Sequence, residues 1–356
     1  MENQTISPNS LPRVAVIGGG HLGRIHAKLL ACNTNCNLLG VADPSDASRT
    51  IVECDLALPS FTDYRVLEKQ IDAAVIAAPT FLHHEIGTWC LERGIHTFIE
   101  KPIAASAEES HELVALAHEN NCVLQVGHVE RFNPAWVTAS SLCAQESVRY
   151  IESAREGSYT GRSTDIGIVM DLMIHDIDLI LSLVPSTLTD INAYGWSVLG
   201  EHEDFAVAQL RFKNGAVAQL RASRISELPK RTMQIHTEAR ICSIDFASGS
   251  LSMIQPQPDV ASGMRQADTL PAAQRLKVKD RLFQEWLSKT EIKSANVNAI
   301  ALEHQEFLEA IQHGKSVTVN GHAGTAALSV ALEVVAAIHH HHGSGLDHTT
   351  VQPFAA

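Results

Sequence analysis

A glycine-rich turn near the start of the chain has the spacing of a phosphate-binding loop. The apolar run Val14–Ile17 leads directly into this turn, and an amphipathic helical pattern follows at Leu22–Leu30. The turn reads Gly18-Gly19-Gly20-His21-Leu22-Gly23. Gly18 would permit a tight turn, Gly20 would let main-chain N–H groups approach a pyrophosphate, and Gly23 would let the helix pack closely on the strand. The pattern predicts a dinucleotide site at the positive end of the helix dipole, against the alternative of a glycine-rich turn that binds nothing.

An acidic residue at the end of the next apolar run indicates which dinucleotide would bind. Asp43 lies twenty residues after Gly23 and directly follows the run Leu38–Ala42. A carboxylate there can accept hydrogen bonds from both ribose hydroxyls of the adenosine, and it would repel a 2′-phosphate. Pro44 comes next, where NADP sites often carry an arginine. We therefore expect NAD rather than NADP.

Two further apolar runs end in polar side chains. Pro79 and Thr80 follow the run Ala73–Ala78, and His83 opens the next helical pattern. Open α/β sheets bind ligands at the carboxyl ends of their strands, so Thr80 is expected to touch the ribose or the nicotinamide, or else to cap the helix.

The second of these runs, Thr97–Ile99, leads into Glu100-Lys101-Pro102. From such a position Lys101 could hydrogen-bond a substrate hydroxyl or shuttle its proton. A surface lysine in a loop is the alternative on position alone.

Acidic residues and a histidine interrupt an otherwise apolar helical pattern at Ile168–Leu183. Asp171, His175 and Asp178 fall at i, i+4 and i+7, which places them on one face of a helix. A buried polar stripe is costly unless it is satisfied or used. His175 would suit a general base for a hydroxyl, with Asp171 one turn away to orient the ring. A structural His–Asp pair is the alternative, and a zinc site is disfavoured because no cysteine or second histidine lies at ligand spacing.

The elements that must position these residues change in character near residue 128. Up to that point, continuous apolar runs alternate with helical patterns such as His83–Arg93 and Ala107–Glu119, which predicts a doubly wound parallel sheet. Beyond it, the sequence alternates like the strands of an antiparallel or mixed sheet, with a hairpin turn at Lys213-Asn214-Gly215. The predicted strands there are Val148–Ala154, Ala206–Phe212, Ala216–Ala222, Thr232–His236 and Ile241–Phe246.

The predicted organisation is a disordered segment 1–12, a dinucleotide domain 13–128, a substrate and oligomerisation domain 129–338, and a flexible tail 339–356. Within the second domain, residues 255–297 are expected to form a long excursion or lid. Helices at Ala301–Gln312 and Ala323–Ile338 are expected to close the fold, and the run His339–His342 is expected to be an unstructured tail.

Composition excludes several classes of partner. The 356 residues carry a formal charge of −13, which would be repelled by nucleic acid and by anionic lipid, so neither is expected as a partner. The seven cysteines are scattered without a CxxC pair, so no metal site is expected. The N-terminus lacks a signal-peptide pattern, and Ala326–Ile338 is apolar but too short to span a bilayer. These features predict a cytoplasmic protein.

The motifs together resemble the Gfo/Idh/MocA oxidoreductase family over roughly residues 13–340. The resemblance rests on Gly18-x-Gly20-x-x-Gly23-x-x-His26, Pro79 with His83, Glu100-Lys101-Pro102 and Asp171-x-x-x-His175. It implies an N-terminal Rossmann domain and a C-terminal α/β domain with a large, open, mostly antiparallel sheet that commonly buries a dimer or tetramer interface. It also implies that Lys101, Asp171 and His175 are catalytic. The cofactor site would then be lined by Gly18, Gly20, His21, Leu22, Gly23, Asp43, Pro79, Thr80, His83, Glu100 and Lys101.

A finer resemblance is to the branch of this family that oxidises the C3 hydroxyl of UDP-N-acetylglucosamine. It rests on the segments 126–134, 171–178 and 222–226. This branch implies an aminotransferase that acts on the ketone, in the synthesis of a lipid A-type precursor. Arginines would suit the substrate diphosphate, with structural ion pairs as the alternative role for each. The expected substrate-binding residues are Arg131, Asn133, Arg162, Asp178 and Arg224.

Other functions stay open on the sequence alone. An inositol, polyol or sugar-phosphate dehydrogenase would use the same catalytic residues. A non-catalytic NAD-binding sensor would lack one of Lys101, Asp171 or His175, and all three are present. An electron donor resembling biliverdin reductase would not need the three together.

Overall fold

The computed structural model describes residues 10–161, 166–295 and 297–343. The chain divides into two compact units. The first contains the chain up to Ala144 together with Ser248–Leu251 and Ile292–Ser329, and the second contains Gln145–Ala247, Ser252–Glu291 and the chain from Val330. The predicted boundary at residue 128 is thus sixteen residues before the point at which the first unit gives way to the second.

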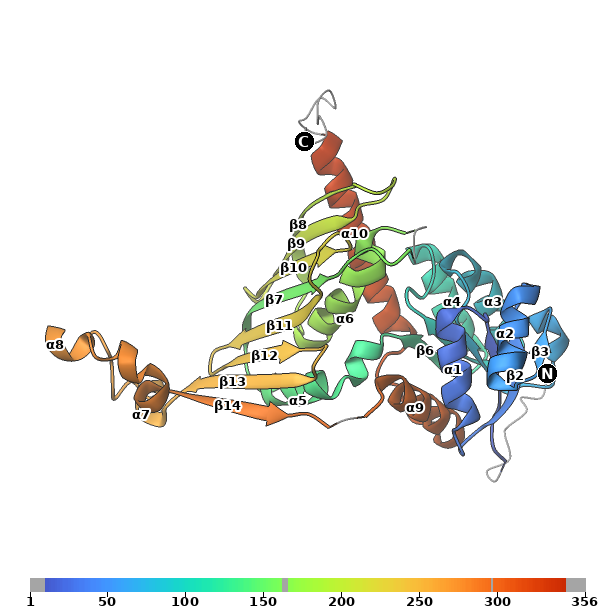
Figure 1. The fold of residues 1–356 in the computed structure, drawn as a ribbon, viewed down its shortest axis with the longest axis horizontal. Helices are drawn as coiled ribbons and strands as arrows, with labels where there is room; N and C mark the ends of the chain where they lie inside the picture. The colour runs from blue at the N-terminus through green and yellow to red at the C-terminus, as the bar shows by residue number, and fades with distance from the viewer. Residues whose placement is uncertain (1–9, 162–165, 296, 344–356) are drawn as a thin grey trace. The chain divides into compact units, whose positions relative to one another are not determined.

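The first unit is built on a six-stranded parallel sheet (Figure 1). Its strands lie in the order β3-β2-β1-β4-β5-β6, so the strand order reverses between β1 and β4, as in a doubly wound fold. This confirms the predicted parallel sheet; the short β3 was not predicted. The strands are β1 (Arg13–Ile17), β2 (Asn37–Ala42), β3 (Ser60–Phe61), β4 (Ala73–Ile76), β5 (His96–Glu100) and β6 (Leu124–Gly127).

Helices connect these strands through crossovers on the two sides of the reversal point. The α-helices of this unit are α1 (His21–Ala31), α2 (Asp46–Leu56), α3 (His83–Leu91), α4 (Ala107–Glu119), α5 (Pro134–Cys143) and α9 (Ala299–His313). The short 3-10 helices are η1 (Tyr64–Leu67), η2 (Thr80–Leu82) and η3 (Val129–Phe132). Helix α9 comes from the end of the chain and packs beside α1 on one face of the sheet. Their shared core includes Val16, Leu30, Phe98 and Phe307.

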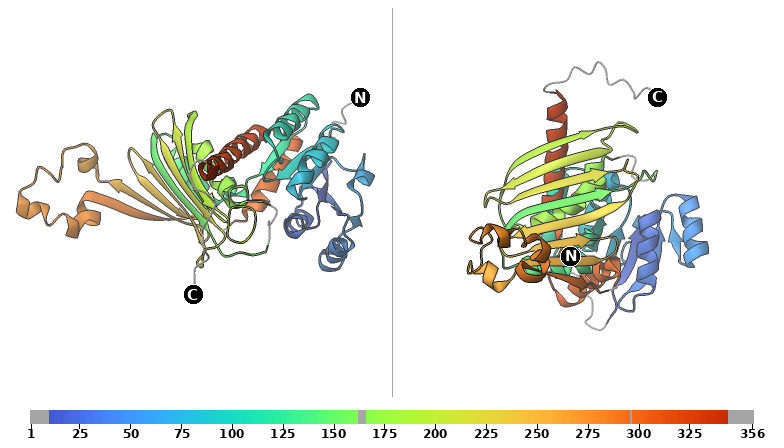
Figure 2. Two further views of the ribbon diagram at one scale, coloured as in Figure 1. Left: turned by 90° about the horizontal axis from the view of Figure 1, so that it is seen from above. Right: turned by 60° about the vertical axis from the view of Figure 1, so that its left-hand side comes forward.

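The second unit is built on an eight-stranded sheet in the order β14-β13-β12-β11-β7-β10-β9-β8 (Figure 1), and Figure 2 shows the same sheet from two further directions. The pairs β7–β11, β11–β12, β9–β10 and β8–β9 are antiparallel, and β7–β10 is parallel, which confirms the predicted mostly antiparallel sheet. Gly215, with φ +87°, lies in the predicted turn between β9 and β10. The strands are β7 (Val148–Glu156), β8 (Leu188–Trp196), β9 (Phe205–Phe212), β10 (Val217–Ser223), β11 (Lys230–Thr237), β12 (Ile241–Asp245), β13 (Ser250–Pro256) and β14 (Leu287–Lys293).

The predicted excursion at 255–297 is shorter than expected, because both of its ends are strands of the sheet. β13 continues to Pro256 and β14 begins at Leu287, so the segment between neighbouring strands is only 257–286. Arg265 holds this segment together: it lies 4.2 Å over the ring of Trp286 and donates to the carbonyl and carboxylate of Glu285. Its short helical pieces are α7 (Pro258–Ala261), α8 (Ala272–Arg275), η5 (Lys279–Arg281) and η6 (Leu282–Trp286).

The last helix, α10 (Gly321–Gly343), is longer than predicted, and the histidine run lies within it rather than in an unstructured tail. By length and composition alone, Gly321–His341 could cross a membrane, which corrects the expectation that the stretch is too short. Half of its most apolar window is nevertheless buried in the protein, as in the core helix of a soluble fold. Residues 1–9 of the predicted segment 1–12 and residues 344–356 of the predicted tail 339–356 lie outside the described residues.

Candidate active site

The glycine-rich turn leaves no room for side chains at two of its positions. Gly18 has φ +108°, and a Cβ on it would lie 2.5 Å from the carbonyl oxygen of Ala77. A Cβ on Gly23 would lie 1.8 Å from the carbonyl oxygen of Gly18. Both positions therefore require glycine: the first for its backbone conformation, the second for the close approach of α1 to the end of β1.

Gly20, in contrast to Gly18 and Gly23, has open space where a side chain would be. It is the N-cap of α1, a Cβ on it would meet nothing within 4 Å, and no side chain caps the helix. The first N–H groups of α1 are thus not used by a capping side chain, and the space before them is open on the side of Gly20. His21 and Leu22 are exposed in the first turn of the helix. This arrangement fits the pyrophosphate of a dinucleotide.

Asp43 is held beside this turn at the end of β2. Its Oδ2 accepts a hydrogen bond from the N–H of Gly19 at 2.6 Å, and its Oδ1 accepts one from the N–H of Ser45 at 2.8 Å. The carboxylate is half-buried. Two main-chain donors therefore fix it next to the phosphate turn, which is the place expected for an adenosine ribose.

Thr80 and His83 lie just after β4. Thr80 is half-buried and begins η2 after Pro79, and it makes no side-chain cap. The ring of His83 is buried, with Nδ1 2.8 Å from the carbonyl oxygen of Pro102 and Nε2 2.8 Å from that of Ala78. Burial lowers the pKa of His83, so the ring is neutral and donates to one of the two carbonyls. Its ring thus joins the loops after β4 and β5, a positioning task that the sequence did not predict.

Lys101 is half-buried directly after β5. Its main-chain N–H donates to Oε2 of the preceding Glu100 at 3.2 Å. Glu100 is buried, and its other oxygen lies 2.8 Å from Nε2 of His26. Glu100 is thus bound to protein groups, and Lys101 is the more accessible of the two side chains.

The segment that carries Asp171 and His175 is not one continuous α-helix. Val169–Met173 forms a π-helical turn, η4, and α6 (Ile174–Leu183) follows it. Such turns occur often at functional sites. Asp171 and His175 are half-buried in this region, whereas Asp178 is 1 % exposed. The two predicted catalytic side chains therefore keep access to solvent, whereas Asp178, a predicted substrate contact, is enclosed by protein.

Arg224 lies in a buried ion pair, which is the alternative role that the sequence left open for each of the arginines. Its Nε lies 3.2 Å from Oδ1 of Asp204, and both side chains are buried, at 8 % and 4 % exposed. Its Nη2 donates to the carbonyl oxygen of Ile166 at 2.7 Å. Glu203, next to Asp204, accepts a hydrogen bond from the N–H of Val169 at 3.2 Å. The Arg224–Asp204 pair and Glu203 therefore hold the start of η4, close in sequence to Asp171.

A second buried ion pair lies at the start of α6. Arg155 on β7 donates from Nη2 to Oδ1 of Asp176 at 2.7 Å, and the two side chains are 4 % and 3 % exposed. Sequence reasoning missed this pair. A charged residue in a strand and another in an apolar helix were the available signals, because each would need a partner when buried.

The remaining predicted substrate residues fall in different surroundings. Asn133 caps α5: its Oδ1 accepts from the N–H of Ala135 at 3.1 Å, and its Nδ2 donates to Glu130 at 3.1 Å. Arg131 is half-buried in η3. Arg162 lies outside the described residues. Within the described part of the chain, no three histidine, cysteine, aspartate or glutamate side chains are grouped so that they could hold a metal ion.

Comparison with known proteins places both units in one family. Residues 12–128 match the sequence model of the oxidoreductase family with an NAD-binding Rossmann fold, and residues 141–241 match the Gfo/Idh/MocA C-terminal domain.

Individual relatives agree with this match. The chain is 33 % identical over 326 residues to UDP-N-acetylglucosamine 3-dehydrogenase of Acidithiobacillus ferrooxidans, covering 92 % of this chain and 97 % of that protein. A solved structure of that enzyme superposes with a TM-score of 0.80, covering 92 % of this chain and 98 % of the other at 32 % identity. The scyllo-inositol 2-dehydrogenase (NAD(+)) of Bacillus subtilis is 30 % identical over 60 % of this chain and 68 % of its own. The chain belongs to the Gfo/Idh/MocA oxidoreductases, and its N-terminal domain is an NAD-binding Rossmann domain.

Proposed function

We propose that this protein oxidises a sugar hydroxyl to a ketone with NAD, and that its substrate is UDP-N-acetylglucosamine, oxidised at C3. The observation that carries the proposal is the 33 % identity to a UDP-N-acetylglucosamine 3-dehydrogenase across nearly the whole of both chains. The uncapped start of α1, the open space at Gly20 and the fixed carboxylate of Asp43 fit the cofactor.

The proposed chemistry uses Lys101, Asp171 and His175. NAD would be held by the glycine-rich turn at the start of α1 and by Asp43, and it would supply the acceptor for a hydride from the carbon that is oxidised. His175 takes the proton of the same hydroxyl as general base, and Asp171 orients its ring. Lys101 hydrogen-bonds the hydroxyl oxygen and stabilises the negative charge that develops there. The products are the ketone, reduced cofactor and one proton, so electrons and protons balance.

Substitution of the two proton-handling groups tests these roles. We expect His175→Ala and Lys101→Met each to lower kcat by about 10²–10⁴-fold, because each removes a group that acts in the transition state. His84→Ala is the matched control for His175→Ala, because it also removes a histidine that is beside a carboxylate. His84 lies on α3 and is paired with Glu112 on α4, so it has no part in the proposed chemistry. Turnover at the wild-type rate in either variant would contradict the proposed mechanism.

A substrate panel tests the proposed specificity. Formation of reduced NAD is followed by absorbance with UDP-N-acetylglucosamine, UDP-glucose, myo-inositol or glucose 6-phosphate, and an aminotransferase is added to remove the ketone. We expect turnover with UDP-N-acetylglucosamine to exceed that with the other three. Turnover with myo-inositol alone would favour a polyol dehydrogenase, as the similarity to scyllo-inositol 2-dehydrogenase would suggest.

The proposal includes a place in a reaction sequence. The ketone would be consumed by an aminotransferase that places nitrogen on C3, toward a lipid A-type precursor made in the cytoplasm. The NADH assay with and without the aminotransferase tests this coupling, since removal of the ketone should raise the yield of reduced cofactor.

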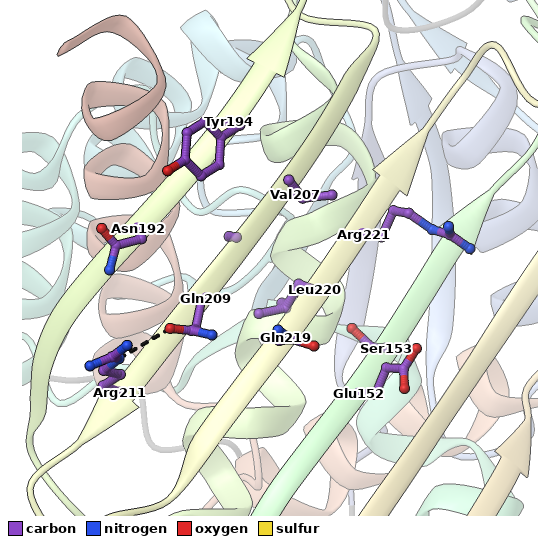
Figure 3. Close-up of a pocket in the computed structure, with 11 residues that line it drawn as sticks. Glu152, Ser153, Asn192, Tyr194, Val207, Gln209, Arg211, Gln219, Leu220 and Arg221 are labelled. Carbon is purple, nitrogen blue, oxygen red and sulfur yellow. Dashed lines mark hydrogen bonds between the residues drawn. The ribbon is translucent and has the colours of Figure 1, made fainter. Parts of the chain in front are cut away.

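We also propose that the protein is a homo-oligomer formed through the open face of the eight-stranded sheet. Alternation along β9 buries Ala206, Ala208 and Leu210 on one face and turns Val207 and Gln209 to the other. The outer face carries a shallow hollow of about 520 Å³, lined by side chains of β7, β8, β9 and β10 (Figure 3). A second copy of the chain would cover this broad, mixed surface.

A further inference from the structure

A buried chain of hydrogen-bonding groups runs from helix α9 to the start of the Lys101 loop. Nε2 of His304 on α9 lies 2.7 Å from Nδ1 of His26 on α1. Nε2 of His26 lies 2.8 Å from Oε1 of Glu100 at the end of β5. Oε2 of Glu100 accepts a hydrogen bond from the main-chain N–H of Lys101 at 3.2 Å. Four groups from three elements are thus joined in sequence within the first unit.

Packing holds this chain of groups in place. Phe98 and Glu100 lie two residues apart on β5, so both side chains point to the sheet face that α1 and α9 cover. The Phe98 ring packs edge-on against His26 at 5.5 Å and His304 at 6.1 Å. On the other side, a Cβ on Gly127 would lie 3.0 Å from the carboxylate carbon of Glu100, so β6 closely flanks the carboxylate.

The hydrogen-bond directions follow from the charge states of the two ends. Burial raises the pKa of Glu100, but the hydrogen bonds from His26 and from the main chain of Lys101, with the charge of Lys101, outweigh it, so the net shift is downward and Glu100 is a carboxylate. His26 must therefore donate from Nε2. Burial lowers the pKa of His304 to about 3, so His304 is neutral. A neutral ring carries one hydrogen, on Nε2 or on Nδ1.

The surroundings of His304 favour one of these two tautomers. Among the described residues, its buried Nδ1 has no hydrogen-bond partner. A hydrogen there would be a buried donor without an acceptor, whereas a hydrogen on Nε2 points at His26 and is used. With His304 donating, the Nδ1 of His26 accepts and its Nε2 donates to Glu100. All hydrogen bonds then run in one direction, toward the carboxylate.

We infer that His304 is a positioning residue for Lys101, acting through His26 and Glu100. It fixes the tautomer of His26, the His26 ring fixes the plane of the Glu100 carboxylate, and the carboxylate holds the main chain at Lys101. The inference rests on the proposed role of Lys101 in turnover. The other titratable groups around this chain are His83, which is electrostatically coupled to Glu100, and Glu303, which is buried beside His304 on α9.

Two substitutions of His304 separate the hydrogen bond from the packing. His304→Gln keeps an N–H donor near the position of Nε2, whereas His304→Leu fills the space without one. With NAD and UDP-N-acetylglucosamine, we expect His304→Leu to lower kcat by about ten- to a hundredfold while KM for NAD changes less than about twofold. We expect His304→Gln to recover most of the loss. Equal loss in both variants, or no loss in His304→Leu, would overturn the inference.

Matched variants identify which claim fails. Phe307→Leu removes ring contacts from the same helix face without touching a hydrogen bond, and it should lower stability while leaving kcat near the wild-type value. If Lys101→Met retained turnover, the proposed function of Lys101 would fail and this inference with it. If Lys101→Met were inactive and His304→Leu fully active, only the role of His304 would fail.

A measurement on the unaltered protein does not depend on how the variants fold. In the full chain with ¹⁵N-labelled histidine, nitrogen NMR should show His304 protonated on Nε2 and bare on Nδ1 from about pH 6 to pH 9. Titration of His304 within that range, or a hydrogen on its Nδ1, would overturn the inference.

Discussion

The carboxylate of Asp43 is expected to determine the preference for NAD over NADP. Its two oxygens are fixed by the N–H groups of Gly19 and Ser45, so it cannot swing away from an added phosphate without losing both hydrogen bonds. A 2′-phosphate would meet a like charge there. A change of one carboxylate should therefore alter the preference between two cofactors that differ by one phosphate.

We predict that Asp43→Ala raises the ratio of kcat/KM for NADP to that for NAD by at least about tenfold, which corresponds to about 1.4 kcal/mol. Steady-state kinetics with each cofactor measures the ratio. Asp46→Ala is the control, since it removes a nearby exposed carboxylate on α2. An unchanged ratio in Asp43→Ala would show that another group excludes NADP.

At the scale of elements, the start of the π-helical turn η4 depends on buried charged side chains just before β9 and just after β10. Arg224 and Asp204 are almost fully enclosed, so removing one partner leaves the other as a buried, unpaired charge. We predict that Arg224→Met lowers the free energy of unfolding by about 3–5 kcal/mol, measured by denaturant titration. The double variant Arg224→Met/Asp204→Leu should recover much of the loss. A double variant as unstable as the single would show that Arg224 acts mainly through Ile166.

The parallel sheet also contains an ion pair, between Arg13 and Asp72, at the amino ends of its strands. Arg13, at the start of β1, donates from Nε, Nη2 and its main-chain N–H to the carboxylate of Asp72, just before β4. Burial raises the pKa of Asp72, but these hydrogen bonds outweigh it, so the net shift is downward. A carboxyl with a lowered folded-state pKa stabilises the protein above its ordinary pKa of 3.8 and loses that contribution as pH falls.

We therefore predict that Asp72→Asn is less stable than wild type at pH 7, and that the difference narrows as pH falls below about 4. Urea unfolding of both proteins at a series of pH values measures it. If the difference in the free energy of unfolding stayed constant down to pH 2, Asp72 would stabilise the protein through packing and neutral hydrogen bonds and not through its charge.

The sequence predicted strands and helices well where their periodicity was strong. Continuous apolar runs marked β1, β4 and β5, and the Asn214-Gly215 turn marked the hairpin of β9 and β10. Periodicity did not reveal the π-helical turn at Asp171, because it changes the hydrogen-bond pattern and not the residue types. Nor could it show that Arg224 and Asp178 are buried, since burial of a charge depends on partners that are distant in sequence. The pairing of His304 with His26 was likewise invisible, because 278 residues separate them.

For the whole molecule, the net charge of −13 disfavours binding to nucleic acid and to anionic membranes, but it does not prevent binding of anionic small molecules. The uncapped start of α1 is a local site for a pyrophosphate within an acidic protein. The proposed assembly through the outer face of the large sheet is the other property of the whole chain.

We predict that the protein has a mass in solution that is a multiple of 38.6 kDa, as measured by light scattering after size exclusion. Val207→Arg, in the middle of the outer face, should shift the mass toward the monomer, because a buried interface would place like charges together. Ile51→Arg on α2, where Ile51 is 38 % exposed, is the control. A wild-type monomer, or an unchanged oligomer in Val207→Arg, would rule out this interface.

In the proposed reaction, a hydride leaves C3 of the sugar for NAD. UDP-N-acetylglucosamine carrying deuterium at C3 is incubated with the protein, NAD and an aminotransferase, and the reduced cofactor is analysed by mass spectrometry. We expect reduced cofactor that carries the deuterium, and a slower rate than with unlabelled sugar if hydride transfer limits turnover. Reduced cofactor without deuterium would contradict oxidation at C3, and no reduced cofactor would contradict the proposed substrate.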